Sequence, residues 1–208
     1  MTSPLRALVA SLRDGTPVLV RPVRPADAPL LREGFERLSD LSRYRRFLRP
    51  VKELSDAQLR YFTEIDYRDH MAWLAVDLSQ PSRPGVGIAR YIRCAHRPTV
   101  AEVAVTVVDT HQGKGLGTLL LGRLALSAVE NGIDTWVAYV LTENTPMLEL
   151  FRDLGATEAK LEEPGVMRVE IPVPPDPSQL PHTPAGKVFR AVARVTSSAR
   201  KGIACLIT

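Results

Sequence analysis

The sequence predicts an α/β (α+β) fold, with short strands and helices interspersed along a chain of 208 residues. One observation behind this prediction is a series of short apolar runs bounded by Gly, Pro, Asp and Ser, which is typical of strands. Another is a set of longer segments with apolar residues at helical spacing and capping residues in front of them. With 45% apolar side chains, the chain is long enough for one buried core with short appendages.

The N-terminal segment comprises residues 1–15 and reads as a frayed start or a short helix. The run 18–20 then predicts a strand, which a proline-rich turn closes. Asp27 follows this turn and is the expected N-cap of a helix that runs toward Leu38.

The middle of the chain predicts a helix and a hairpin. Residues 54–65 place apolar side chains on one side of a helix that Ser55 can cap. The apolar runs 71–78 and 86–93 flank a loop rich in proline, glycine and serine, so they predict two antiparallel strands.

The rest of the body continues the alternation of strands and helices. Pro146 and Gly155 bracket a short predicted helix over 145–154, because Pro favours the first helical turn and Gly the position after the last. A strand over 166–171 closes the body. The remaining predicted elements are a strand at 100–108, a helix at 115–132 and a strand at 135–141.

The C-terminal part differs in composition from the body. Six prolines lie in 172–184, which predicts an extended linker that does not pack. A basic tail follows over 185–208, and we expect it to be solvated or weakly docked. The body over 16–171 is the predicted domain.

The charge distribution argues against a body that binds nucleic acid. The net charge is +4, but five basic residues and no acidic ones follow Asp176. The rest of the chain holds 22 basic and 23 acidic residues, so the excess of positive charge belongs to the tail. We therefore expect no nucleic-acid partner.

Other function classes are also disfavoured. No apolar run reaches the roughly 18 residues that span a bilayer, and no signal-peptide core is visible, so we expect neither a membrane partner nor export. Two cysteines are too few for a disulfide framework and favour a cytoplasmic protein. The four histidines show no ligand spacing, so we expect no metal.

A glycine-rich turn is the most informative motif. Gly113, Gly115 and Gly117 lie between the strand 100–108 and a helix, where backbone N–H groups can approach an anion such as a phosphate. Gly115 stands where a Walker loop needs Ser or Thr, and the spacing does not fit a dinucleotide fingerprint. The alternative is that the glycines only connect a strand to a helix.

Two more positions are candidates for chemistry. Glu102 is the only charged residue in 100–108, on a strand face that is otherwise small or apolar, which suits a general base. The alternative is a solvated residue at a strand end. Asn144 precedes Thr145 and Pro146, which explain the helix start and leave the Asn144 amide available for a ligand; alternatively, Asn144 serves only the turn.

Together these residues resemble the GNAT N-acetyltransferases. Gln112, Gly115 and Gly117 match the Q/R-x-x-G-x-G/A signature of that family, and the resemblance extends over 16–171. The later family motif is matched by Asn144, Met147, Phe151 and the ending Leu154-Gly155-Ala156.

A narrower resemblance is to the bacterial protein lysine acetyltransferases of the Pat type, which acetylate acyl-CoA synthetases. Several segments carry it, all of them N-terminal to the glycine turn. They are Asp14-Gly15, Arg21 to Asp27, Leu38-Ser39, Ser42 to Phe47, Ile65 to Tyr67, Gly87 to Tyr91 and Ala101 to Val105.

The resemblance implies a fold and a cosubstrate. The expected fold is a mixed, mostly antiparallel central sheet flanked by helices, with a V-shaped splay between the fourth and fifth strands, 100–108 and 135–141. Acetyl-CoA would bind there, with pantetheine near Val105 and Val107 and the pyrophosphate on N–H groups of the turn. The implied cofactor-binding residues are Val105, Val107, Gln112, Gly113, Lys114, Gly115, Leu116, Gly117, Thr118, Asn144, Met147 and Phe151.

The resemblance also implies a reaction. Glu102 matches the catalytic glutamate of the Pat type, and the implied acceptor is a lysine of a protein such as an acyl-CoA synthetase. Many relatives carry a Tyr on the helix after the Asn as a proton donor, but Phe151 or a neighbour occupies that region here, so no general acid is assigned.

Two other readings stay open. One is a GNAT enzyme acting on a small amine or amino acid, and the other is an acetyl-CoA sensor without activity. An acidic open groove around 38–49 would favour a protein lysine, and a closed pocket a metabolite. The arginines Arg43, Arg45, Arg46 and Arg49 either pair with internal acids or meet an acidic partner.

Overall fold

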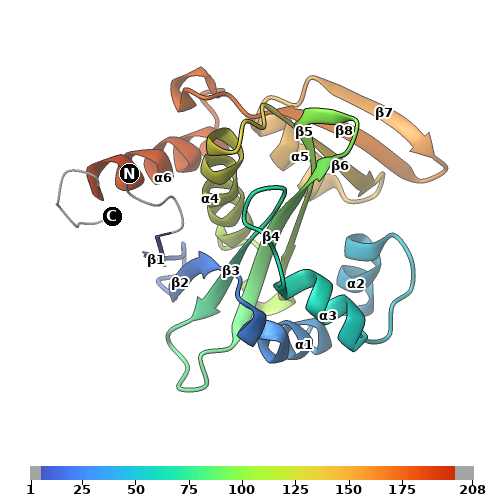
Figure 1. The fold of residues 1–208 in the computed structure, drawn as a ribbon, viewed down its shortest axis with the longest axis vertical. Coiled ribbons are helices and arrows are strands. Elements are labelled where there is room, and N and C mark those ends of the chain that lie inside the picture. Colours follow the sequence, from blue (N-terminus) through green and yellow to red (C-terminus); the bar gives the residue numbers. More distant parts are fainter. Residues whose placement is uncertain (1–5, 200–208) are drawn as a thin grey trace.

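The fold is an eight-stranded sheet with helices on both faces, seen in a computed structural model that describes residues 6–199 and the side chains of 6–194 (Figure 1). The strands are β1 (Leu8–Ser11), β2 (Pro17–Pro22), β3 (His70–Asp77), β4 (Gly85–Cys94), β5 (Arg97–Val107), β6 (Thr135–Leu141), β7 (Glu158–Glu163) and β8 (Val166–Pro172). The helices are α1 (Ala28–Glu36), α2 (Asp40–Phe47), α3 (Asp56–Thr63), α4 (Leu116–Glu130), α5 (Thr145–Asp153) and α6 (Pro184–Ala199). Short 3₁₀ turns are η1 (Pro25–Asp27), η2 (Asp109–His111) and η3 (Pro177–Gln179).

The sheet is antiparallel except at one junction. The strand order is β1-β2-β3-β4-β5-β6-β8-β7, and only β5 and β6 are parallel neighbours. These two strands pair at Val100, Ala101 and Glu102 alone. Beyond Glu102, β5 stays paired with β4 and β6 with β8, so the two strands diverge. The expected V-shaped splay is therefore present.

Two layers of helices cover the sheet. One face carries α1, α2 and α3 over a core that includes Leu31, Phe35 and Leu74. The other face carries α4 over the larger core, which includes Trp73 and Leu120 (Figure 1). The alternation of side chains along β3 and β4 supplies both cores at once.

The predicted helices and strands are found with small shifts at their ends. Ser55 caps α3 as expected, since its hydroxyl oxygen accepts a hydrogen bond from the Gln58 backbone N–H. The Gln58 side-chain oxygen in turn accepts one from the Ser55 backbone N–H. The hairpin of β3 and β4 is confirmed. Asp27 lies at the N-cap position of α1, but its carboxylate binds Arg21 and the Arg24 backbone N–H.

Two strands, β1 and β7, were not predicted from the sequence. The described part of 1–15 forms β1, which pairs with β2, so a frayed start or helix is wrong there. β7, over 158–163, was not expected, because four of its six residues are charged and most are exposed. Such residues suit an edge strand, which β7 is.

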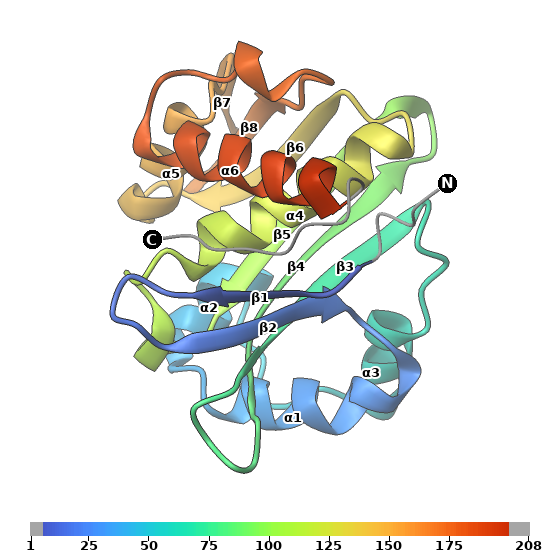
Figure 2. The ribbon, with the colours of Figure 1, turned by 90° about the vertical axis from the view of Figure 1, so that its left-hand side faces the viewer.

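The expectation of an unpacked linker and tail is wrong for 172–194. Val173 and Leu180 of the proline-rich segment are buried in the larger core. Thr183 caps α6, and Phe189 and Val192 of this helix pack on α4, where Gly122 leaves room for them. Figure 2 shows α6 lying over α4.

The rest of the tail, 200–208, lies outside the described residues, and the domain boundaries stay a prediction. Within 6–199, no helix is both long and apolar enough to cross a membrane.

Candidate active site

A cleft of about 490 Å³ opens where β5 and β6 diverge. All predicted cofactor-binding residues except Lys114 line it. They are Val105, Val107, Gln112, Gly113, Gly115, Leu116, Gly117, Thr118, Asn144, Met147 and Phe151. Residues that are far apart in sequence therefore meet at the splay.

The β5 side of the cleft combines a free strand edge with apolar side chains. From Val103 onward, β5 has no strand partner on the side of β6 among the described residues. The side chains of Val105 and Val107 face α4, about 3.9 and 3.8 Å from the position that a Cβ on Gly117 would take. Polar backbone groups at this edge can bind the amides of an extended ligand.

The glycine turn has a backbone that other residues rarely adopt. Gly113 and Gly115 have φ angles of 72° and 87°, and Gly115 is the N-cap of α4. A helix start without side chains presents its N–H groups to the cleft. The Arg13 side chain lies over Gly115 and also lines the cleft, which adds a positive charge beside this anion-binding corner.

Lys114 has a different place from the one predicted. Its Nζ lies 2.8 Å from Oδ2 of Asp14, and its carbonyl accepts a hydrogen bond from the Arg13 backbone. The hydrogen bond from Lys114 holds the pKa of Asp14 well below its usual range. Lys114 thus fastens the glycine turn to the β1–β2 connection, and Arg13 takes the position beside the cleft.

A hydrogen-bond network joins α2 to the glycine turn. The carboxylate of Asp109 accepts hydrogen bonds from the Ser39 backbone, the Ser39 hydroxyl and the Ser42 hydroxyl. Burial opposes ionisation of Asp109, but these bonds hold its pKa below the usual value. Gln112 donates to the Ser42 hydroxyl and to the Val107 carbonyl. The start of α2 is therefore fixed relative to the cleft.

Glu102 lies at the last residue pair before the strands diverge, opposite Ile92 on β4 and Val137 on β6. Its side chain is exposed and does not line the cleft. It shares a sheet face with Arg90, on the side of α1–α3, because Arg90 pairs with Ala104. The exposure of Glu102 is what a solvated residue would have. Its position at the apex of the splay is compatible with the alternative, a general base, so both interpretations stay open.

On the α5 side of the cleft lie Asn144 and Phe151, both predicted to bind the cofactor. Asn144 precedes α5 and makes no side-chain capping bond, as expected if its amide is available. Phe151 is 2% exposed and carries no proton to donate. Tyr139 of β6 is the phenol that lines the cleft, and its exposed fraction is 37%.

Sequence reasoning missed Arg13, Ser42, Arg45, Arg46 and Tyr139, all of which line the cleft. The two α2 arginines belong to the noted arginine cluster, but their direction depends on how α2 docks. Neither Arg45 nor Arg46 has an ion pair among the described residues, whereas Arg43 lies 3.8 Å from Asp40. The residues of 38–49 that line the cleft are Ser42, Arg45 and Arg46, so this segment does not supply the acidic groove that would have favoured a protein lysine.

Comparison with known proteins identifies the family. Residues 18–157 match the family described as the acetyltransferase (GNAT) domain. The chain belongs to the GNAT acetyltransferase family. The expectations of a GNAT fold and of an acetyltransferase are confirmed at this level. Within the described residues, no group of three or more His, Cys, Asp or Glu could hold a metal ion.

The most informative relatives of this GNAT chain carry the Pat name. Acetyltransferase Pat of Mycolicibacterium smegmatis is 38% identical over 164 residues, which are 79% of this chain and 48% of the relative. The crystal structure of the GNAT domain of S. lividans PAT is 35% identical, with a TM-score of 0.72, and the match covers 80% of this chain and 96% of that one. The chain spans about half the length of the M. smegmatis relative.

A more distant GNAT structure shares the fold only. This Salmonella typhimurium protein contains acetyl-CoA, is 19% identical and has a TM-score of 0.59, with 76% of this chain and 94% of that chain covered.

Proposed function

We propose that this protein transfers the acetyl group of acetyl-CoA to the ε-amine of a lysine in another protein, such as an acyl-CoA synthetase. The observation that carries the proposal is the cleft at the splay, which gathers eleven of the twelve residues expected to bind acetyl-CoA. The Pat name of the relatives supports the lysine acceptor.

The cleft suits the chemistry of acetyl-CoA. The unpaired edge of β5 offers N–H and C=O groups to the two amides of pantetheine. The pyrophosphate would lie on the N–H groups at the start of α4, beside Arg13. Gly113 would meet no atom within 4 Å if it carried a Cβ, so its small size leaves open space for a ligand.

Deprotonation of the acceptor is the step that needs a base. A lysine amine has a pKa near 10.4, so about one molecule in 2,500 is neutral at pH 7, which costs about 4.6 kcal/mol. Glu102, directly or through a water molecule, would accept the proton. Glu102 stands at the apex of the splay, where the acetyl end of the cosubstrate would lie.

The amine nitrogen then attacks the thioester carbonyl, the carbon–sulfur bond breaks, and the thiolate of CoA leaves with the electron pair. A thiol with a pKa near 8.5 is a good leaving group, so the thiolate can depart unaided and take a proton from water. This fits the presence of Phe151 where many relatives have a Tyr, and we assign no general acid.

The exposure of Glu102 favours a large acceptor over a small one. A lysine side chain on a protein surface can reach an exposed carboxylate, whereas a small amine is better held in a closed pocket. A small-amine acetyltransferase and an inactive acetyl-CoA sensor are the alternatives. A cytoplasmic location is part of the proposal and rests on the low cysteine content.

The proposal is tested by incubating the protein with isotopically labelled acetyl-CoA and candidate acyl-CoA synthetases. Mass spectrometry of the digested synthetases should find label on a lysine. Label on free amines but on no synthetase would point to the small-amine alternative. Binding of acetyl-CoA without transfer to either kind of acceptor would point to a sensor.

A further inference from the structure

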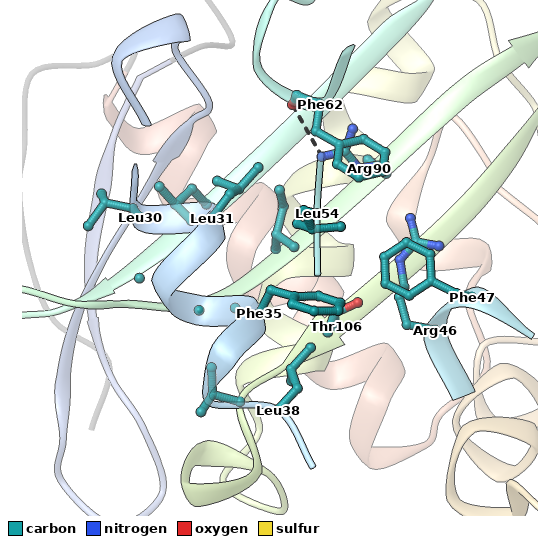
Figure 3. A pocket seen from close by; sticks show the side chains of 16 residues that line it. Leu30, Leu31, Phe35, Leu38, Arg46, Phe47, Leu54, Phe62, Arg90 and Thr106 are labelled. Carbon is teal, nitrogen blue, oxygen red and sulfur yellow. Dashed lines mark hydrogen bonds between the residues drawn. The ribbon is translucent and has the colours of Figure 1, made fainter. Parts of the chain in front are cut away.

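Two arginines point into a small cavity beneath α1, α2 and α3. The cavity holds about 70 Å³ and lies between these helices and the face of β4 and β5 that carries Glu102. Figure 3 shows the guanidinium groups of Arg46, from α2, and Arg90, from β4, directed toward the same region. Most of the remaining lining is apolar, including Phe35, Phe47 and Phe62.

Neither guanidinium has a carboxylate partner among the described residues. Arg90 is 5% exposed, and its hydrogen-bond partners are Nε2 of His70 at 2.9 Å and the Phe62 carbonyl at 3.2 Å. Arg46 stacks over the Phe47 ring, 5.0 Å from its centre. All of these partners are neutral, since a guanidinium can only donate and His70 must accept.

The surroundings make both positive charges costly. Burial and the charge of Arg46 lower the pKa of Arg90 to about 9. Burial also lowers the pKa of Arg46, although the charge of Glu102 opposes this. Burial and the charge of Arg90 lower the pKa of His70 to about 4, so His70 adds no positive charge at pH 7. Arg90 is buried and Arg46 half-buried, and among the described residues no carboxylate lies within ion-pair distance of either guanidinium, although the charge of exposed Glu102 acts on Arg46.

A third polar group faces the same cavity. The Thr106 hydroxyl is buried and has no hydrogen-bond partner among the described residues. Thr106 and Arg90 lie on the face of the sheet that carries Glu102. Thr106 and Arg46 line the acetyl-CoA cleft as well as the cavity, so the two spaces adjoin.

The cavity is large enough for a small anionic group. One water molecule needs a cavity volume of about 10–15 Å³. The cavity volume of about 70 Å³ therefore accommodates a carboxylate together with the methylene that carries it. A planar carboxylate also matches the guanidinium fork better than a spherical ion does.

We infer that Arg46 and Arg90, with the Thr106 hydroxyl, form a recess that binds a carboxylate of the acetyl acceptor beside Glu102. The inference rests on the proposed acetyl transfer and adds a substrate class to it: the acceptor amine carries an acidic group nearby. That group is an Asp or Glu close to the target lysine in a protein, or the α-carboxylate of a free amino acid.

Steady-state kinetics with matched acceptors test the recess and distinguish the two sources. One series places Asp or Glu at each position within three residues of a central lysine in a short peptide, with Asn or Gln at the same position as the matched neutral peptide. The other compares free lysine with lysinamide. In one of the two series, the acidic acceptor should have a kcat/KM about tenfold or more above that of its amide.

The ratio of kcat/KM for the acidic acceptor to kcat/KM for its amide counterpart is then measured in the variants Arg46→Gln and Arg90→Gln. The ratio should fall toward one in both, and Arg46→Lys should keep part of it, because the charge is retained without the fork. Arg49→Gln removes an exposed charge from the same segment and should leave the ratio as it is. No acidic preference in either series, or an unchanged ratio in both Gln variants, would overturn the inference.

A binding experiment separates failure of the recess from failure of the proposed reaction. Sodium acetate is titrated at constant ionic strength, made up with sodium chloride, while the melting temperature is followed. The parent should gain about 2–4 °C in a saturable manner, and Arg46→Gln should gain none. A saturable rise in melting temperature without any acetyl transfer would support the carboxylate-binding recess and contradict the proposed reaction. Acetyl transfer without such a rise and without a preference for acidic acceptors would support the reaction and overturn the recess.

Discussion

The side chains of β5 divide between the two faces of the sheet. Val105 and Val107 face α4 and the glycine turn, whereas Thr106 and Glu102 face the side of α1–α3. The place expected for the acceptor thus adjoins the place expected for acetyl-CoA along this strand, and Thr106 lines both spaces. This alternation follows from the sequence, since neighbouring residues of a strand point in opposite directions.

The direction of Arg46 was beyond sequence reasoning. Arg45 and Arg46 stand in a run of arginines, and nothing local says which of them faces the cleft or a cavity. That choice depends on the docking of α2, which Asp109 fixes through Ser39 and Ser42, about 70 residues earlier in the chain. Contacts of this range are set by tertiary packing.

His70 makes stability depend on pH. Its folded pKa, about 4, lies below its ordinary value of 6.5, so the unfolded chain binds more protons between these values. The stabilisation is present above about pH 6.5 and is lost as the pH falls toward 4. Between pH 7 and pH 5 we expect His70 to account for about 1–2 kcal/mol of lost unfolding free energy, after discounting for solvent.

Urea unfolding at pH 5 and pH 7 checks this expectation. His70→Gln keeps an acceptor for Arg90 but cannot be protonated, so the variant should lose less stability between the two pH values than the parent does. Equal losses in the two proteins would show that His70 does not carry the effect.

At the scale of elements, the sequence predicted what local chemistry determines. The cap at Ser55, the helix start at Thr145-Pro146 and the hairpin of β3 and β4 depend on neighbouring residues, and the structure contains all of them. β1 and β7 were missed because each is a short edge strand that depends on pairing with its neighbour. β1 also packs Leu8 and Ala10 against the larger core, whereas most of β7 is charged and exposed. The splay was expected only from the family resemblance.

Gly117, in the first turn of α4, lies beside Val105 and Val107 in the cleft. A branched side chain in place of Gly117 would fill the cleft beside Val105 and Val107, while the first turn of α4 tolerates a Cβ at 3.8 Å. Gly117→Val should weaken acetyl-CoA binding about tenfold to a hundredfold, and Gly117→Ala should weaken it less. Isothermal titration with acetyl-CoA measures both. Affinities equal to that of the parent would place the cosubstrate elsewhere.

At the scale of the whole molecule, α6 belongs to the core. The density of prolines before it suggested a linker, but Val173, Leu180 and Phe189 pack with the body. An apolar residue every few positions within a proline-rich segment was the signal that favoured packing. Composition alone does not show whether such residues find a surface to cover, and here α4 offers one at Gly122.

Removal of the Phe189 ring should therefore destabilise the whole fold. Phe189 is 6% exposed, and Phe189→Ala should lower the free energy of unfolding by about 3 kcal/mol. Lys187→Ala, which removes an exposed side chain from the same helix, should change it by about 0.5 kcal/mol or less. Equal effects in urea unfolding would mean that α6 does not stabilise the body.

The whole molecule brings the glycine turn, the open edge of β5 and Glu102 together at one splay, where we propose that Glu102 acts as the base in acetyl transfer. The turnover rate of Glu102→Gln at saturating acetyl-CoA, with a lysine acceptor and with Glu162→Gln as an exposed control, tests it most directly. The rate should fall about a hundredfold to ten-thousandfold in Glu102→Gln, with acetyl-CoA affinity unchanged, and stay at the parental value in Glu162→Gln. A Glu102→Gln rate equal to that of the parent would contradict the claim.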